Sequence, residues 1–222
     1  MSGCGIPGPV CGSNASPIDD GTLMRWWSPP PGPVCKANES PAARHWHSYC
    51  RTGGFAASTL TMSPLAVTLL QAIETLRLKP YDDQTSDEIS AWVKGATIGY
   101  GHLIASGEWS TYKGGVNATQ AEDLFKADTA PYERTVGQTI SVGVQQYEFD
   151  AMVILAFNIG HTGFRESSVA RLVNDPSLAT QHTTLEAAWK AWNKSQGKVN
   201  RGLVNRRVAE WRIYTSGIYA RW

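Results

Sequence analysis

Residues 74–102 read ETLRLKPYDDQTSDEISAWVKGATIGYGH and place two carboxylates on different structural elements. Glu74 stands near the end of an apolar helical pattern. Asp83 follows nine residues later, beyond Pro80, which should end that helix. Residues 97–103 are typical of a strand with bends that glycine permits. Because two acids in different surroundings can divide general-acid and general-base work, this stretch predicts a catalytic cleft between a helix and a sheet.

Helical patterns lie on both sides of this stretch. Ser63 followed by Pro64 predicts an N-cap and the first position of the helix that carries Glu74. From residue 117 onward the pattern is helical to the end, with Thr119 and Glu122 as a capping box. The expected later helices are 144–158, closed by Gly160; one from Ser167 or Ser168 through Val173; one from Thr183; and one over roughly 202–214. One small sheet followed by many helices predicts an α+β fold with two lobes.

Composition excludes several classes of protein. The chain has 222 residues, of which 42% are hydrophobic and 18% are charged, as in a globular domain with a sizeable core. It contains no apolar run of about 18 residues, so we expect no transmembrane helix. The first residues, MSGCGIPGPVCG, lack the basic start and apolar core of a secretory signal.

Charge is unevenly distributed along the chain. The formal net charge is +1, yet residues 186–222 hold eight Lys and Arg against only Glu186 and Glu210. A basic C-terminal third is compatible with attraction to a polyanion such as nucleic acid, anionic lipid or a bacterial wall. Solvated helix faces explain the same residues equally well, and charge alone does not separate the two interpretations.

All cysteines lie in a Gly- and Pro-rich N-terminal arm, residues 1–60, which shows no sustained periodicity. Two disulfides among them would brace a segment without a core, and would imply an oxidising destination. The alternative is a metal site at Cys35, His45, His47 and Cys50, whose spacing does not match the common zinc patterns. The arm's aromatic residues favour packing against the main domain over a sugar-binding role. The disulfide candidates are Cys4, Cys11, Cys35 and Cys50.

The 74–102 stretch resembles the phage-type lysozymes of the T-even class. The core of that family reads E-x-L-R-L-x-x-Y-x-D followed by T-I-G-x-G-H, which residues 74–83 and 97–102 match. Residues 157–160 (FNIG) are similar to the family's F-N-x-G segment. The FRESS run at 164–168 resembles its F-x-x-S-T turn, and GLVNRRVAE at 202–210 resembles its closing helix. The resemblance covers about residues 61–222 in family order, and leaves the arm unmatched.

The resemblance implies a lysozyme-like α+β fold and an N-acetylmuramidase. Such an enzyme hydrolyses the β-1,4 bond between N-acetylmuramic acid and N-acetylglucosamine in peptidoglycan, with inversion. Glu74 would be the general acid, Asp83 the water-directing base and Thr97 the water-positioning hydroxyl. Asp82 is the rival of Asp83, but the family spacing from the glutamate selects Asp83.

Further site residues follow only from the same positional match. The residues expected to line the sugar subsites are Leu103, Phe157, Ser167 and Asn193, with Arg206 near the cleft. His102 and His161 are expected to be structural histidines with satisfied hydrogen bonds. The resemblance implies no cofactor and no metal.

Two departures from the family pattern stand out. The segment between Asp83 and Thr97 is longer than in compact members, with residues 86–94 inserted, and should form a lip over the cleft. Pro80 also stands where many members carry an aliphatic or small residue, which could shift the turn that presents Asp83.

Other functions remain open at this stage. A lytic transglycosylase needs the acid but not the Asp83–Thr97 pair, and a wall-binding module needs neither. The biological setting could be a phage or prophage endolysin, or a secreted antibacterial toxin with an immunity protein as partner. We expect a monomer that binds peptidoglycan glycan strands and not nucleic acid. We also expect it to be made in the bacterial cytoplasm without a signal peptide, and to act in the periplasm or cell wall after release.

Overall fold

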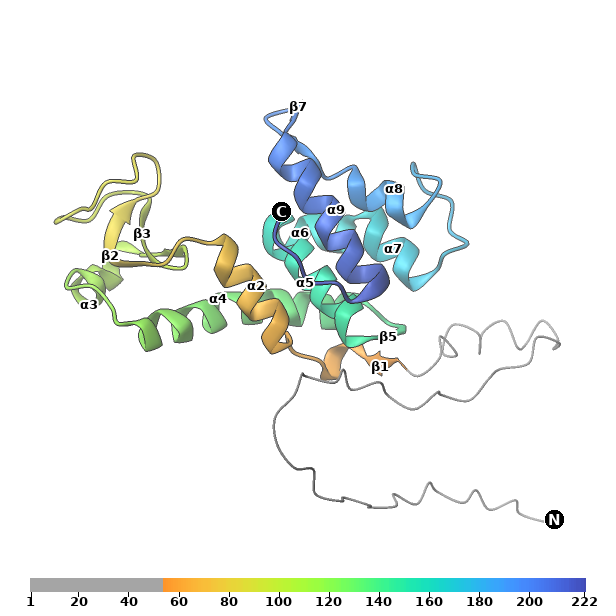
Figure 1. Cartoon of the computed structure of the whole chain (residues 1–222), viewed down its shortest axis with the longest axis horizontal. Helices are drawn as coiled ribbons and strands as arrows, with labels where there is room; N and C mark the ends of the chain where they lie inside the picture. The colour runs from red at the N-terminus through yellow and green to blue at the C-terminus, as the bar shows by residue number, and fades with distance from the viewer. Residues whose placement is uncertain (1–53) are drawn as a thin grey trace, which may run out of the picture. The chain divides into compact units, whose positions relative to one another are not determined.

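A computed structural model describes residues 54–222 of the chain. Within this range the long helix α4, Ala118–Thr139, runs from a small antiparallel sheet to a group of shorter helices (Figure 1). The predicted α+β, lysozyme-like fold is confirmed by its structural neighbours, reported below. The four cysteines, and with them the predicted disulfides and the alternative metal site, lie outside the described residues.

The sheet has the strand order β2-β3-β4, and all its pairs are antiparallel. Its strands are β2 Arg77–Asp82, β3 Ala96–Gly99 and β4 His102–Leu103. Beneath it lies a small core of Ala96, Ile98 and Ile104, covered by half-buried side chains that include Trp109 and Leu124. The 3₁₀ turn η2, Ser106–Glu108, and helix α3, Trp109–Tyr112, follow β4 and close this part of the fold.

Helix α2, Pro64–Ile73, ends earlier than predicted. We expected Pro80 to stop it, but Glu74 already has an extended backbone, with φ −79° and ψ 134°. Pro80 lies instead inside β2, at an irregularity in the pairing between Arg77 and Tyr81. Proline has no N–H to donate to a neighbouring strand. It is tolerated here because β2 is an edge strand and its pairing is irregular at this point. Pairing of β2 with β3 therefore overrides the local helical pattern after Ile73.

The N-terminus of α2 is held by a buried carboxylate. Ser63 caps the helix as predicted, and its hydroxyl accepts from the Ala66 N–H at 3.2 Å. The Ser63 N–H and hydroxyl donate to the fully buried Asp150 carboxylate at 3.0 and 2.5 Å. The Tyr219 hydroxyl donates to the same group at 2.5 Å. Asp150, which lies in helix α5 (Gln146–Ile159), thus joins this helix to α2 and the C-terminal residues, and fixes the element that ends at Glu74.

The N-cap of helix α4 lies two residues before the predicted cap. Asn117, not Thr119, is the N-cap residue, because its side chain accepts from the Gln120 N–H at 2.9 Å. The Gln120 side chain accepts in return from the Asn117 N–H at 2.9 Å. The predicted Thr119–Glu122 box is wrong, since Thr119 already lies within the first turn. Asparagine serves the same function as the predicted threonine.

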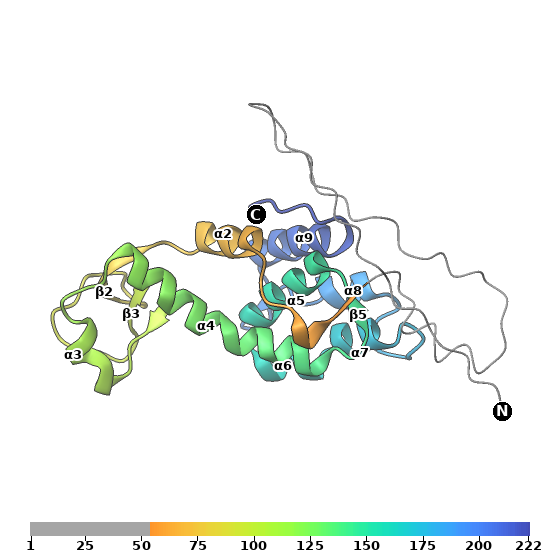
Figure 2. The same ribbon diagram turned by 90° about the horizontal axis from the view of Figure 1, so that it is seen from below.

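Helix α5, Gln146–Ile159, is the buried centre of the helical region, as predicted. Residues 149–156 are all buried, and Gly160 ends the helix with a φ of 83°. Figure 2 shows α5 between α9 and α6. The surrounding helices are α6 His161–Glu166, α7 Ser168–Asn174, α8 Leu185–Lys190 and α9 Arg201–Ser216. None of the helices formed by residues 54–222 is long and apolar enough to cross a lipid bilayer.

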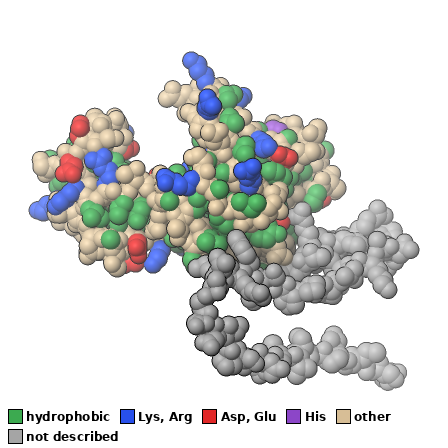
Figure 3. All heavy atoms as spheres, in the orientation of Figure 1, with side chains coloured by type: hydrophobic (Ala, Val, Ile, Leu, Met, Phe, Trp, Pro, Cys, Tyr) green, Lys and Arg blue, Asp and Glu red, His purple; other side chains and the backbone are tan. Residues whose placement is uncertain are grey.

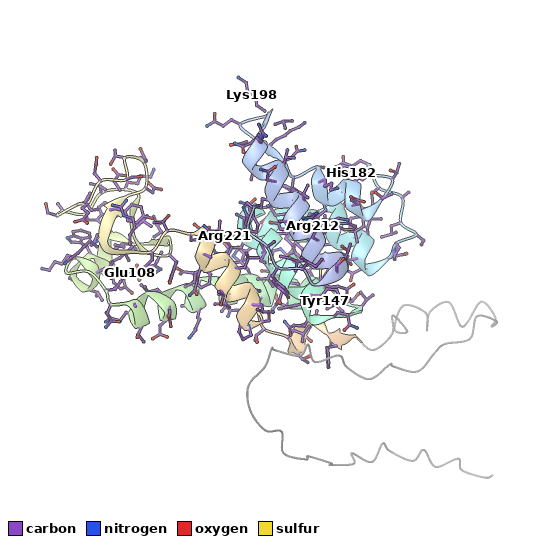
Figure 4. The ribbon with its side chains drawn as sticks, in the orientation of Figure 1. Glu108, Tyr147, His182, Lys198, Arg212 and Arg221 are labelled. Carbon is purple, nitrogen blue, oxygen red and sulfur yellow. The ribbon has the colours of Figure 1, made fainter. Side chains whose placement is uncertain are left out.

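Two details of the helical half differ from the sequence prediction. Thr184, rather than Thr183, caps α8, since its hydroxyl accepts from the Ala187 N–H at 3.1 Å. The region after residue 117 is also not helical throughout. The strands β6 Lys194–Ser195 and β7 Lys198–Val199 form an exposed hairpin between α8 and α9. Lys198 extends at the tip of this hairpin, away from the helices (Figure 4).

Residues 54–59 pack onto the folded domain. Strand β1, Phe55–Ala56, pairs with β5, Gly143–Val144, and the 3₁₀ turn η1, Ala57–Thr59, packs against α4. The approach is close, because a Cβ at Gly137 of α4 would lie 3.0 Å from the Ser58 Cα. These residues fall within the predicted arm 1–60, of which residues 1–53 lie outside the described range.

Candidate active site

Glu74 lies at the C-terminal end of α2, where its N–H donates to the Leu70 carbonyl at 3.1 Å. Its side chain is half-buried, and burial raises the pKa of the carboxyl above its ordinary value of 4.5. The positive charge of Arg206 acts in the opposite direction and lowers that pKa. Desolvation is the larger effect, so the group keeps its proton to a higher pH than an exposed glutamate would. Glu74 therefore has the environment that a general acid needs.

Asp83 follows the last residue of β2 and is exposed. Its N–H donates to the Gly95 carbonyl at 3.1 Å, which closes the long segment between the two residues. Gly95 has a φ of 101°, and a Cβ there would lie 2.3 Å from the Asp83 Oδ1. Only glycine fits this position, because any side chain would strain the backbone and displace the carboxylate.

Thr97 lies in β3 and is only 4% exposed. Its hydroxyl donates to the Gly95 carbonyl at 2.9 Å, the same oxygen that receives the Asp83 N–H. Since the hydroxyl hydrogen is used in this bond, the Thr97 Oγ1 can act toward a further partner only as an acceptor. Gly95 thus links the predicted base to the predicted water-positioning hydroxyl.

Tyr81 is a site residue to which sequence reasoning assigned no role. It lies opposite Thr97 in the β2–β3 pair, and the Arg77 guanidinium stands 4.3 Å from its ring centre. Burial raises the pKa of Tyr81, the Arg77 charge lowers it, and the negative charges of Glu74 and Asp83 raise it further. Both carboxylates therefore lie within electrostatic reach of one phenol. No local signal indicated this role, because the helix was expected to continue to Pro80, whereas pairing of β2 with β3 places Tyr81 opposite Thr97.

Arg206 belongs to a buried ion network centred on Glu210. The Arg206 Nε and the Arg207 Nη2 donate to the Glu210 Oε1 at 2.9 and 2.8 Å. The Trp189 indole donates to the Glu210 Oε2 at 3.0 Å, and the Arg207 Nη2 also donates to the Asn158 Oδ1 at 2.8 Å. Burial raises the pKa of Glu210 and lowers that of Arg207, while their mutual attraction opposes both shifts. Through Arg206 this network acts on the Glu74 carboxyl.

Two predicted subsite residues are aromatic or aliphatic. Leu103 is 62% exposed on β4 and lies opposite Thr97 in the sheet. Phe157 is half-buried near the end of α5 and packs between rings, 5.2 Å from Tyr132 and 6.4 Å from Phe125, centre to centre. Leu103 thus shares a sheet face with Thr97, whereas Phe157 lies in the helical half.

The two polar subsite candidates make contacts within the protein. Ser167 is buried and caps α7, donating to the Phe164 carbonyl at 2.7 Å and accepting from the Ala170 N–H at 3.0 Å. It also lines a pocket of about 260 Å³ together with Trp192. Asn193 is half-buried, and its carbonyl accepts from the Asn200 N–H at 2.8 Å across the β6–β7 hairpin. Their roles toward a sugar remain predictions.

The two histidines have partners on α4. The His161 Nδ1 lies 2.8 Å from the Thr135 hydroxyl, and its ring stacks on Tyr132 at 4.2 Å. The His102 Nδ1 lies 3.0 Å from both Asp128 oxygens, whereas its Nε2 is buried without a hydrogen-bond partner. The expectation of fully satisfied hydrogen bonds therefore does not hold for His102. Among residues 54–222, no three His, Cys, Asp or Glu side chains are grouped as a metal site would require.

The His102–Asp128 pair predicts a pH-dependent stability. The hydrogen bond that His102 donates to Asp128 raises the pKa of His102 above its ordinary value of 6.5, although burial opposes the shift. The pair's contribution is therefore complete below the unfolded-state pKa near 6.5, and is lost as pH rises through the higher folded-state pKa. We expect the Tm difference between the wild type and Asp128→Asn to be largest below pH 6.5 and to shrink as pH rises through the raised pKa of His102. A His182→Gln variant should show no such trend, and a constant difference would contradict the prediction.

The surface is hollowed between the sheet region and the helices on the face shown in Figure 3. The connection from α2 to β2, which begins at Glu74, runs below this hollow in the same orientation (Figure 1). An acid at a helix end, a second carboxylate and a hydroxyl on the facing sheet are the parts of a glycosidase site. The fold and the site thus define the class of lysozyme-like proteins.

Comparison with known proteins identifies the family. The phage lysozyme family model matches residues 71–210, and the chain belongs to that family. It is 36% identical over 159 residues to an endolysin of Bacillus phage PZA, covering 71% of this chain and 56% of the relative. An endolysin of Bacillus phage B103 is 30% identical over 158 residues, covering 71% of this chain and 55% of the relative. The chain therefore spans about half the length of these curated relatives.

Solved structures give the same grouping. The endolysin from Escherichia coli O157:H7 phage FAHEc1 has a TM-score of 0.58 and 27% identity, covering 73% of this chain and 98% of that one. The muramidase domain of SpmX from Asticaccaulis excentricus has a TM-score of 0.54 and 28% identity, covering 70% of this chain and 98% of that domain. Membership of the phage lysozyme family, predicted from the motif blocks, is confirmed, and residues 1–53 remain unmatched.

Proposed function

We propose that this chain is a peptidoglycan hydrolase of the N-acetylmuramidase type. It cleaves the β-1,4 bond between N-acetylmuramic acid and N-acetylglucosamine with inversion. The observation that carries the proposal is the contrast between the two carboxyls. Glu74 is half-buried with a raised pKa, whereas Asp83 is exposed at the end of β2. Acids held in such different environments take the separate roles of proton donor and base.

The proposed mechanism follows from the hydrogen bonds around Gly95. Glu74 gives its proton to the oxygen of the leaving sugar. A water donates one hydrogen to the Asp83 carboxylate and the other to the Thr97 Oγ1, which can only accept because its own hydrogen is held by the Gly95 carbonyl. A lone pair of that water then points to the anomeric carbon. Asp83 takes the water's proton as the new bond forms.

Product analysis tests this proposal against a lytic transglycosylase. Hydrolysis leaves a reducing N-acetylmuramic acid end, whereas a transglycosylase leaves a 1,6-anhydro ring and consumes no water. We expect mass spectrometry of digested peptidoglycan to show reducing ends only, with ¹⁸O incorporated from labelled water. Proton NMR taken early in the reaction should show the inverted anomer. Anhydro ends would overturn the hydrolase, and no cleavage at all would favour a wall-binding module.

Thr97 offers a prediction specific to the water. Thr97→Val removes the acceptor oxygen while keeping the side-chain shape, so we expect kcat to fall about a hundredfold, as for a misplaced reactant. Thr97→Ser keeps the hydroxyl and should retain kcat within about threefold. Steady-state kinetics on a soluble peptidoglycan fragment, with melting curves for both variants, provides the measurement. Equal kcat values for the two folded variants would show that the hydroxyl does not position water.

The biological role that we propose is bacterial wall lysis by a phage or prophage endolysin, made in the cytoplasm and acting in the wall. Support comes from the curated relatives, which are phage endolysins. A gene neighbourhood with phage lysis functions would agree with this role. A neighbouring immunity gene, whose product inhibits the purified chain, would instead indicate a secreted antibacterial toxin.

A further inference from the structure

The long segment between Asp83 and Thr97 is anchored along its length. The Ser86 N–H donates to the Asp82 carbonyl at 2.8 Å, and the Asp82 N–H donates to the Asp87 carbonyl at 2.9 Å. The Ile89 N–H reaches the Pro80 carbonyl at 3.0 Å. From the other side, the Arg77 guanidinium donates to the Ser86 carbonyl at 2.7 Å. The backbone of the segment is therefore held to β2 by hydrogen bonds at several points.

Trp92 lies in this segment with an oriented ring. Its indole N–H donates to the Ile104 carbonyl at 2.9 Å, which ties the polar edge of the ring to the end of the sheet. Its neighbour Val93 and the nearby Ile89 pack onto the small core beneath. Trp92 nevertheless remains 40% exposed. Because its N–H is satisfied and its neighbours are packed, the exposed part is an apolar face that the fold leaves uncovered.

Leu103 supplies a second exposed apolar side chain at the same place. It directly precedes Ile104, whose carbonyl holds the Trp92 indole, and is 62% exposed. It also lies opposite Thr97, so its side chain is on the same sheet face as that candidate catalytic residue. Apolar area of this kind beside a polar site is typical of a ligand-binding surface.

We propose that Trp92 extends the sugar subsite expected at Leu103, and that its exposed ring binds the apolar C–H face of an N-acetylhexosamine unit. The inference rests on the proposed function, because the ligand is a glycan strand. A pyranose ring presents polar hydroxyls at its edge and C–H groups on its faces. An indole ring with its N–H already bonded matches such a face and cannot compete for the hydroxyls. Trp92 therefore determines how tightly, and how far along the strand, substrate is held.

Binding to a catalytically inactive protein tests the subsite directly. In a Glu74→Gln background, calorimetry with a defined peptidoglycan tetrasaccharide should give a Kd about tenfold higher for Trp92→Ala, equivalent to about 1.4 kcal/mol. Trp92→Phe keeps an aromatic face and should remain within about threefold of the parent. Leu178→Ala, which truncates a side chain that is 41% exposed after α7, is the matched control and should not change the Kd.

Kinetics separates this subsite from the proposed chemistry. With Glu74 present, Trp92→Ala should raise KM for the tetrasaccharide and leave kcat unchanged. If Trp92→Ala does not fold, Leu103→Ala and Trp92→Phe decide, since the first must weaken binding and the second must preserve it. Unchanged Kd values in folded Trp92→Ala or Leu103→Ala would overturn the subsite while hydrolysis by the wild type persists. Failure of the wild type to hydrolyse peptidoglycan would instead overturn the proposed function.

Discussion

Glu74→Gln is expected to lower kcat on peptidoglycan by about a thousandfold, within the range that a positioned general acid contributes. The amide has nearly the same shape as the carboxyl but has no proton to give to the leaving oxygen. The substitution should not destabilise the fold, because burial disfavours the charged form of Glu74 and the amide carries no charge. The measurement is steady-state kinetics with melting curves, so that a loss of rate is separated from a loss of structure.

The matched control for that experiment is Glu122→Gln on the exposed side of α4, which removes one negative charge far from the acid. It should keep full activity. The pH profile adds an independent criterion, since the rate should fall as pH rises through the raised pKa of Glu74. Full lysis by the folded Glu74→Gln protein would assign the acid to another residue.

Much of this site could be predicted because its chemistry lies close together in the sequence. The sequence placed Glu74 near a helix end, Asp83 on a turn and Thr97 at the start of a strand. The structure has Glu74 at the end of α2, Asp83 directly after β2 and Thr97 in β3, although β2 itself was not predicted. The end of α2 was missed because it is determined by the pairing of β2 with β3. That pairing is a tertiary contact, and an apolar pattern at helical spacing gives no information about it. The cap of α4 was missed because several residues in succession can cap a helix, and backbone geometry selects one.

Other contacts could not be predicted, because they join residues that are distant in the sequence. Nothing local indicates that Asp150 accepts from Ser63, 87 positions earlier, or that the Trp92 indole reaches the Ile104 carbonyl. Arg206 shows both cases. Its pair with Glu210, and that of Arg207, have the i,i+4 and i,i+3 spacing of helix neighbours. Their burial, and the bond that the Trp189 indole donates from 21 positions earlier, emerge only from the packing of α9 against α8. The sequence therefore indicates the candidate reacting groups better than it indicates the residues that hold them in position.

Glu210→Ala is expected to destabilise the protein by about 3–5 kcal/mol, as for removal of one partner from a buried ion pair. The substitution leaves the guanidiniums of Arg206 and Arg207 buried without their carboxylate, and deprives the Trp189 indole of its acceptor. Urea denaturation gives the free energy of unfolding. Glu186→Ala breaks the exposed ion pair with Lys190 and should cost less than about 1 kcal/mol. Similar losses for the two variants would mean that the buried network contributes little.

Glu210→Gln tests the electrostatic role of the network, because it removes the charge while keeping hydrogen-bonding atoms in place. In the wild type, the negative charge of Glu210 partly offsets Arg206, whose positive charge lowers the pKa of Glu74. Without that offset Arg206 acts on Glu74 more strongly, so the pKa of the acid falls. The alkaline limb of the pH–rate profile, which requires protonated Glu74, should then move to lower pH. Since a purely structural loss would lower activity equally at every pH, a displaced limb at unchanged Km would show that the buried network tunes the catalytic acid.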